Sequence, residues 1–384
     1  MKRKTALLAL LISLSILLPS CISSSIIRLE TLPPEESREN PTSAPTEELA
    51  PVVGGIWSDE QALAAAELML RHPTGGVVDI SKSAYSYDEM VADLQNLAKI
   101  YPRYFRCGVI GTSVAGRELY VGVLGNPNAP KQVVVTAAIH AREYLTALLV
   151  MKQLEFYLQS YTKGSYKGIS YSTLFEECCF YIVPMVNPDG VMMAQEGLPS
   201  LPLTLQTKIL NIYETEQHSY ESVSAFLACW KANANGVDLN RNYDALWDEY
   251  NKTGVPASSQ YKGPSPASEP ETQAMVSLIS SLPNVVCSLC IHSQGEVIYW
   301  NCGQKGEAAA ATRAFAGAVS RLNGYYVVPE QNNDASLSDW CELKLGVVAI
   351  TVETGNVACP LPIEQFHDIF LDNYLLWAMT ALYF

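Results

Sequence analysis

The chain reads Lys131-Gln-Val-Val-Val-Thr-Ala-Ala-Ile139 and then His140-Ala-Arg-Glu143 at its most informative point. The first nine residues are an apolar run rich in β-branched side chains, which predicts a buried strand. Apolar residues then recur at helical spacing from Tyr144 to Leu158, so a helix should follow and hold Glu143 in its first turn. Two ligand residues three positions apart, with a distant third, are the pattern of a catalytic zinc site that keeps a fourth position open.

An H-x-x-E tetrapeptide alone is more often a pair of ordinary polar residues at a strand–helix turn. Two further apolar strands change that interpretation. The run from Asn284 to Ile291 leads into His292, and the run from Val347 to Val352 leads into Glu353. Open α/β sheets bind ligands at the carboxyl ends of their strands. The sequence therefore predicts that the ends of these three strands form one site.

Five motifs follow one another along the chain. They are His140-Ala-Arg-Glu143, Asn187-Pro-Asp-Gly190, Gly236-Val-Asp-Leu-Asn-Arg-Asn242, Ile291-His-Ser293 and Thr351-Val-Glu-Thr354. In this order they resemble the zinc carboxypeptidase family, and five ordered motifs are far more specific than any one. The resemblance runs from about Tyr85 to the C-terminus. It implies an α/β fold, a three-layer sandwich in which a mixed, mostly parallel twisted sheet has helices on both faces. The alternation of strands and helices along the chain fits that architecture.

The resemblance implies a role for each matching residue. His140, Glu143 and His292 would bind one Zn²⁺ per chain, with water in the fourth position, and Glu353 would be the general base. Zinc lowers the pKa of its water and polarises the scissile carbonyl, while a carboxylate outside the ligand set carries protons. Asp238 would accept the other ring N–H of a zinc-bound histidine and fix its tautomer.

Four more residues would contact the substrate. Asn240 and Arg241 would grip its carboxylate, a bidentate task that suits a guanidinium, and Arg142 is also expected to bind substrate. Without the surrounding motif, Asn240 and Arg241 would be interpreted as a solvent-facing loop pair. Lys231 follows Trp230 where the family places the arginine that stabilises the oxyanion, so a lysine would carry that catalytic charge.

Two stretches resemble a bacterial branch of the family, the γ-D-glutamyl-L-diamino acid endopeptidases that cut peptidoglycan stem peptides. They run from Trp230 to Asn242 and from His292 to Trp300. The family's substrate-capping tyrosine has no clear counterpart near residues 330–340. Tyr325 and Tyr326 lie a few residues upstream, at a spacing that does not match.

The N-terminus predicts export. Residues 2–4 are basic and Thr5 to Leu18 is an apolar run, the right length for a signal peptide and too short to span a membrane. The ending Leu18-Pro-Ser-Cys21 resembles a bacterial lipobox. Residues 1–20 are therefore expected to be a signal peptide, and lipidated Cys21 to anchor the protein to the outer face of the membrane. The alternative is a plain signal peptide and a secreted protein.

Composition divides the remainder into three parts. Residues 22–52 are rich in Ser, Pro, Thr and Glu and are expected to form a disordered tether. Residues 53–84 form a short extension with one helix, Asp59 to Arg71. Residues 85–384 form the peptidase domain, whose first helix begins with a capping box of Ser86 and Glu89.

Charge and cysteine content limit the classes of binding partner and the roles open to the cysteines. The formal charge of −14 becomes −17 (−14 − 3) once residues 2–4 are removed. So acidic a chain argues against nucleic acid or anionic lipid as a partner. Ten cysteines leave nine besides Cys21, an odd number with no assignable pairing. Cys287 and Cys290 form a C-x-x-C, but they lie in a predicted strand and should point to opposite faces.

Three functions remain for comparison. The first is zinc-dependent hydrolysis of γ-D-glutamyl-diamino acid bonds in peptidoglycan stem peptides at the cell envelope. The second is an exported carboxypeptidase that trims C-terminal residues from peptides or proteins. The third is a non-catalytic lipoprotein that binds wall peptides, which the presence of all three metal ligands together with Glu353 argues against.

Overall fold

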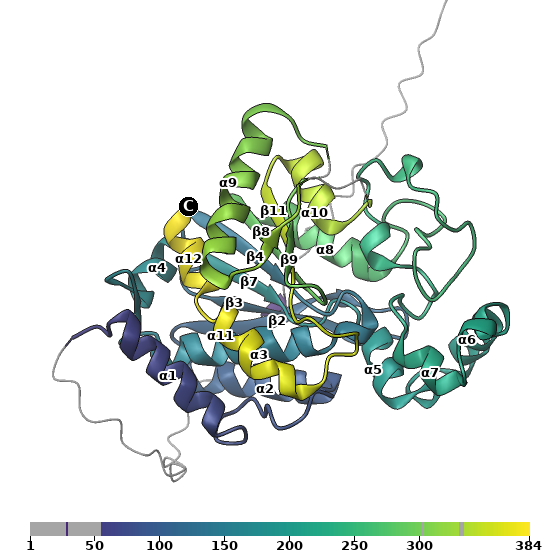
Figure 1. The fold of residues 1–384 in the computed structure, drawn as a ribbon, viewed down its shortest axis with the longest axis horizontal. Helices are drawn as coiled ribbons and strands as arrows, with labels where there is room; N and C mark the ends of the chain where they lie inside the picture. Colours follow the sequence, from purple (N-terminus) through teal and green to yellow (C-terminus); the bar gives the residue numbers. More distant parts are fainter. Residues whose placement is uncertain (1–27, 30–54, 302, 330–333) are drawn as a thin grey trace, which may run out of the picture.

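The computed structural model describes residues 28–29, 55–301, 303–329 and 334–384. A nine-stranded sheet runs through this part of the chain in the order β1-β2-β3-β7-β4-β8-β11-β9-β10 (Figure 1). Its strands are β1 (Arg28–Leu29), β2 (Phe105–Thr112), β3 (Glu118–Leu124), β4 (Lys131–Thr136), β7 (Cys178–Val183), β8 (Val285–His292), β9 (Val297–Tyr299), β10 (Tyr326–Val327) and β11 (Val348–Glu353). A small hairpin is formed by β5 (Ser165–Tyr166) and β6 (Ile169–Ser170).

The centre of the sheet is parallel, and most pairings outside this centre are antiparallel. Strands β7, β4, β8 and β11 are parallel neighbours. The pairings β1–β2, β2–β3, β3–β7 and β11–β9 are antiparallel, and β9–β10 is parallel. Five of the nine strands (β2, β7, β4, β8 and β11) therefore point the same way, which confirms the predicted mixed, mostly parallel sheet.

Helices cover both faces of this sheet (Figure 1). They are α1 (Asp59–Arg71), α2 (Tyr87–Ile100), α3 (Leu145–Ser160), α4 (Tyr171–Glu177), α5 (Pro188–Glu196), α6 (Leu203–Glu216), α7 (Val223–Ala228), α8 (Pro270–Ser281), α9 (Gly306–Asn323), α10 (Leu337–Trp340), α11 (Phe366–Asn373) and α12 (Leu376–Tyr383). None of the helices in the described ranges is both long and apolar enough to cross a bilayer. The capping box of Ser86 and Glu89 is present at the start of α2.

Strand alternation separates two hydrophobic cores. Val133 and Val135 of β4 pack in the larger core with α2, α3, α9, α11 and α12, whereas Val134 packs in a smaller core with α8 and α10. Cys287 and Cys290 also fall into opposite cores, as the strand period requires. This arrangement confirms that the C-x-x-C sequence is a strand segment whose two cysteines are both unpaired.

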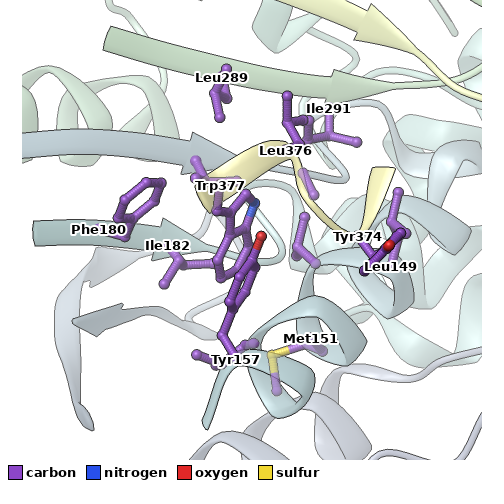
Figure 2. Packing of buried hydrophobic residues seen from close by; sticks show 14 of the residues in the cluster. Leu149, Met151, Tyr157, Phe180, Ile182, Leu289, Ile291, Tyr374, Leu376 and Trp377 are labelled. Atoms are coloured by element: carbon purple, nitrogen blue, oxygen red, sulfur yellow. The ribbon is translucent and has the colours of Figure 1, made fainter. Parts of the chain in front are cut away.

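The larger core contains a stack of aromatic rings beneath the C-terminal helix α12. The Trp377 ring lies 5.4 Å from that of Tyr157 and 5.8 Å from that of Phe180, measured between centroids, and both pairs are stacked (Figure 2). These side chains join α12, α3 and β7. Large buried aromatic surfaces contribute strongly to stability, so this stack fixes α3 against the sheet.

The segment before α2 packs tightly against α3. The backbone N–H groups of Val77 and Val78 donate to the Glu155 carboxylate at 2.6 and 3.3 Å. Lys152 pairs with Glu155 at 2.8 Å and donates to the Val78 carbonyl at 3.0 Å, and both charged side chains are fully buried. The predicted short extension therefore packs onto the peptidase domain. Composition alone did not indicate this contact.

The predicted signal peptide, Cys21 and nearly all of the predicted tether lie outside the described residues. The exception within residues 22–52 is the pair Arg28–Leu29, which forms β1 and pairs antiparallel with Val109 and Gly108 of β2. The tether stays a prediction, and at these two positions the backbone pairs with the edge of β2, which offers unpaired backbone groups to a passing strand.

Candidate functional site

Three neighbouring parallel strands deliver the side chains of the site to one edge of the sheet. His292 is the last residue of β8 and Glu353 the last residue of β11. His140 follows β4 by a few residues and precedes a 3₁₀ turn, Ala141–Glu143. Glu143 therefore ends a short turn ahead of α3 and does not lie inside the helix, a small correction to the sequence-based prediction. Its backbone carbonyl accepts a hydrogen bond from Thr146 at 2.6 Å, which holds the turn against the start of α3.

His140, Glu143 and His292 form a compact buried cluster. Nδ1 of His140 lies 2.9 Å from Glu143 Oε1, and Nδ1 of His292 lies 2.9 Å from Glu143 Oε2. One ligand atom from each residue lies within 4.8 Å of the other two. Two imidazole nitrogens and one carboxylate with an open fourth position are the donor set of catalytic zinc sites. These residues therefore fit a single zinc ion.

A buried carboxylate behind His140 fixes the orientation of its ring. Nε2 of His140 lies 3.2 Å from Asp238 Oδ1, so Nδ1 is the nitrogen left for a metal. Asp238 is fully buried, and its Oδ2 accepts a hydrogen bond from the Gln260 N–H at 2.9 Å. Burial alone would raise the pKa of Asp238, but His140, Arg241 and Lys231 hold it well below its ordinary value. The carboxylate stays ionised and orients the His140 ring.

Glu353 lies beside the cluster and outside the ligand set. Burial raises the pKa of its carboxyl group to about 7, an effect that His292 opposes and Glu143 reinforces. A carboxylate whose pKa lies near the working pH can both take up and release a proton. This position suits a proton carrier.

A pocket of about 470 Å³ opens over the cluster. It is lined by His140, Arg142, Lys231, Asn240, Arg241, Ser293, Gln294, Tyr299, Asp334, Ser336, Thr351 and Glu353. Lys231 Nζ lies 3.8 Å from Glu143 Oε1. Nε of Arg142 is buried without a hydrogen-bond partner among the described residues.

Arg241 lies farther from the cluster, on the short 3₁₀ turn Leu239–Arg241. Its Nη1 donates to the Asn240 carbonyl at 2.7 Å and its Nε donates to the Tyr250 hydroxyl at 3.0 Å. Asp238 and Asp334 raise the pKa of the guanidinium against the opposing effect of burial. Asn240 directs Oδ1 to the Leu337 N–H at 3.1 Å, which ties this turn to the start of α10.

The structure brings together all the predicted site residues that it describes, and it adds others. Asp334 and Tyr299 line the pocket, but the sequence assigned a role to neither, although Tyr299 lies in the stretch from His292 to Trp300 that resembles the bacterial branch. Neither Tyr325 nor Tyr326 is among the residues that line the pocket. Tyr325 is buried and accepts a hydrogen bond from Asn373 at 3.0 Å, and Tyr326 lies on β10, outside the set of pocket-lining residues.

Comparisons with known proteins agree with this geometry. Residues 90–366 match the family model described as zinc carboxypeptidase. The chain is 32% identical over 289 residues to the gamma-D-glutamyl-L-diamino acid endopeptidase 1 of Lysinibacillus sphaericus, covering 74% of this chain and 69% of that protein. It is 32% identical over 306 residues to the uncharacterized protein YqgT of Bacillus subtilis (strain 168), covering 78% and 77%. The solved structure of thrombin activatable fibrinolysis inhibitor shares the fold, with a TM-score of 0.62 at 19% identity, covering 85% of this chain and 80% of that one.

Proposed function

Because this chain belongs to the zinc carboxypeptidase family, we propose that it cleaves peptidoglycan stem peptides between γ-D-glutamate and a diamino acid. The broader activity follows from family membership and the His–Glu–His cluster: the chain is a zinc-dependent metallopeptidase. The observation that carries the narrower proposal is the similarity to the Lysinibacillus sphaericus enzyme, which is named for that bond. Family membership and the His–Glu–His cluster argue against the alternative of a non-catalytic binding protein.

The site residues divide the reaction among them. A zinc ion held by His140, Glu143 and His292 would lower the pKa of a water molecule and polarise the scissile carbonyl. Glu353 takes the proton from the attacking water and later gives it to the leaving amine. Lys231 lies next to the cluster and stabilises the negative charge that develops on the carbonyl oxygen.

Arg241 and Asn240 hold the leaving side of the substrate. The guanidinium is largely buried, with its side chain 12% exposed, and is already oriented by Tyr250 and by the Asn240 carbonyl. A planar, permanently charged group in a fixed orientation suits a carboxylate. In the proposed substrate this carboxylate belongs to the diamino acid, whereas in an exported carboxypeptidase it would be the terminal carboxylate of an ordinary peptide.

Mass spectrometry of reaction products tests the proposal. The zinc-loaded protein should release the diamino acid, alone or with a short continuation, from L-Ala-γ-D-Glu-diamino acid peptides, and it should scarcely cleave matched peptides built from α-linked L-residues. Glu353→Gln serves as the inactive control. Stepwise trimming of the α-linked peptides without cleavage at γ-D-glutamate would identify an exported carboxypeptidase.

We also propose that the mature protein is anchored by Cys21 on the outer face of the bacterial membrane. The basic residues 2–4, the apolar run Thr5 to Leu18 and the lipobox-like ending support this location. Labelling cells with a radioactive fatty acid should mark the wild-type protein, and Cys21→Ser should abolish the label and release the protein from the membrane fraction. A labelled Cys21→Ser variant would place the modification elsewhere.

A further inference from the structure

Asp334 and Arg241 stand side by side in the pocket. Oδ2 of Asp334 lies 3.5 Å from Nη2 of Arg241. That distance exceeds the roughly 2.7–2.9 Å of a charge-assisted hydrogen bond, so the ion pair is loose. Tyr250 and the Asn240 carbonyl meanwhile fix Nε and Nη1 of the guanidinium. One edge of Arg241 and the neighbouring carboxylate are therefore presented together to a ligand in the pocket.

The surroundings of Asp334 favour a further positive charge. Burial raises the pKa of Asp334, Arg241 counteracts this effect, and the nearby carboxylates Asp339 and Asp238 raise the pKa again. The side chain is still 38% exposed, so a ligand can reach it. A cation placed next to Asp334 would relieve the repulsion from the other two acids. Among the described residues that line the pocket, Glu353 is the other acid, and its position by the metal ligands commits it to the reaction.

This pair is poorly suited to a carboxylate alone. A substrate carboxylate that approaches Arg241 also approaches Asp334, and two like charges at close range repel each other. A ligand with a carboxylate and an ammonium group on neighbouring atoms would satisfy both residues. The free end of an α-amino acid is such a ligand, because its two charged groups are attached to one carbon.

Building on the proposed function, we propose that Arg241 and Asp334 together bind the free amino acid end of a diaminodicarboxylic acid on the leaving side of the scissile bond. The carboxylate lies on Arg241 and the ammonium group on Asp334. Asp334 is thereby a specificity residue that distinguishes this diamino acid from lysine. In a C-terminal lysine the free ammonium is separated from the carboxylate by the whole side chain, which does not match two adjacent receptor groups.

Kinetics with three peptides test this assignment. L-Ala-γ-D-Glu-meso-diaminopimelate carries the free amino acid end, its distal N-acetyl derivative lacks the ammonium group, and L-Ala-γ-D-Glu-L-Lys lacks the amino acid end. Asp334→Asn should lower kcat/KM for the first peptide by about 10- to 100-fold, the range expected for loss of a hydrogen bond between charged groups. It should change kcat/KM for the other two by less than about threefold, within the effect of a neutral surface substitution.

The matched control is Asp244→Asn. It removes the same charge from an exposed pair with Lys344, outside the pocket, and should leave all three rates unchanged. Acetylation of the distal amine should lower the wild-type rate by about the same factor as Asp334→Asn, with no further loss when the two changes are combined. An equal fall for all three peptides would show that Asp334 merely positions Arg241, and would overturn the proposal. A rise in kcat/KM for the first peptide would also overturn it, since Asp334 would then only repel the substrate.

Binding measurements separate this inference from the proposed function. In the Glu353→Gln background, calorimetry should show that Asp334→Asn weakens binding of the diaminopimelate peptide at least about tenfold and leaves the acetylated peptide unaffected. Failure of the wild-type protein to cleave any γ-D-glutamyl peptide would refute the proposed function. If Asp334→Asn still weakened binding of the diaminopimelate peptide in that case, the proposed amino acid site would remain supported. If the peptide bound equally well with and without the Asp334→Asn change, the proposed site would be refuted.

Discussion

His292 and Glu353 are paired residues on adjacent parallel strands, His292 at the end of β8 and Glu353 at the end of β11. Backbone hydrogen bonds of the sheet therefore set the spacing between a metal ligand and the proposed proton carrier. Neither residue depends on a flexible loop for its position. The backbone N–H of Thr354 donates to the His292 carbonyl at 2.8 Å and continues the ladder past the strand ends. Such rigid placement is what positioned acid–base catalysis requires.

The metal ligands can be tested one at a time. His140→Ala or His292→Ala should remove the bound zinc and the activity together, because the remaining donors cannot complete a catalytic zinc site. Elemental analysis of the purified variants gives the stoichiometry. His367→Ala, which changes an exposed histidine that pairs with Asp368, is the control and should keep both zinc and activity. Stoichiometric zinc in either ligand variant would contradict the assignment.

Glu353→Gln keeps the size of the side chain but removes its ability to accept a proton. Turnover should fall at least about 10²-fold while zinc content is unchanged. Because burial raises the pKa of Glu353 to about 7, the wild-type kcat/KM should decrease as the pH falls below that value and the base becomes protonated. The variant should lack this acidic limb. Exposed Glu364, changed to Gln, should alter neither the rate nor the pH profile.

Arg241→Ala should weaken the reaction by several kcal/mol, on the order of 3, since a desolvated substrate carboxylate would lose its charged partner. The loss should appear in kcat/KM for the γ-D-glutamyl peptides. Arg321→Ala, at the last turn of α9 and outside the pocket, is a matched control with the same change of charge. If kcat/KM in Arg241→Ala stays within about threefold of wild type, another cation must hold the carboxylate.

A buried carboxyl group outside the metal-ligand cluster should make stability depend on pH. Glu271 is fully buried and accepts hydrogen bonds from the Val114 N–H at 3.1 Å and from Asn233 Nδ2 at 3.2 Å. Burial raises its pKa from 4.5 to about 7, and Asp189 adds to the increase. The folded state therefore retains a proton that the unfolded state has lost. This contribution, up to about 3 kcal/mol, is present below pH 4.5 and disappears as the pH rises through 7.

Urea denaturation between pH 4.5 and 8 measures the effect. Glu271→Gln cannot titrate, so its free energy of unfolding should vary less with pH over that window than the wild-type value does. The exposed residue Glu177, changed to Gln, should leave the wild-type dependence intact. Parallel curves for wild type and Glu271→Gln would show that Glu271 does not titrate in this range.

The sequence was sufficient where structure depends on local patterns. Runs of β-branched residues located β4, β8 and β11, and each ends beside a residue of the site, so the carboxyl-end rule gathered His140, His292 and Glu353 correctly. The spacing of His140 and Glu143 indicated a pair of metal ligands, and the resemblance to a family then supplied Asp238 and Arg241, whose motif lies on a turn without regular periodicity. Local pattern and motif order thus predicted both the sheet and the metal cluster.

What the sequence did not reveal depends on contacts between distant segments. Tyr299 reaches the pocket because β9 pairs antiparallel with β11, a pairing that no periodicity encodes. Asp334 is one of several acids in its region, and only the approach of Arg241 from almost a hundred residues earlier distinguishes it. The edge pairing of Arg28–Leu29 is likewise a long-range event inside a segment whose composition predicts disorder.

The hydrogen bonds from Val77 and Val78 to Glu155 determine how short a recombinant fragment of the catalytic domain can be. A fragment that began at Tyr85 would leave Glu155 without two backbone donors and Lys152 without its carbonyl acceptor. Both charges lie on α3, the helix that starts two residues after the metal ligand Glu143. Recombinant fragments, fusions and transplants of this catalytic module should therefore start before residue 57, where the Trp57 N–H already bonds to the Lys163 carbonyl.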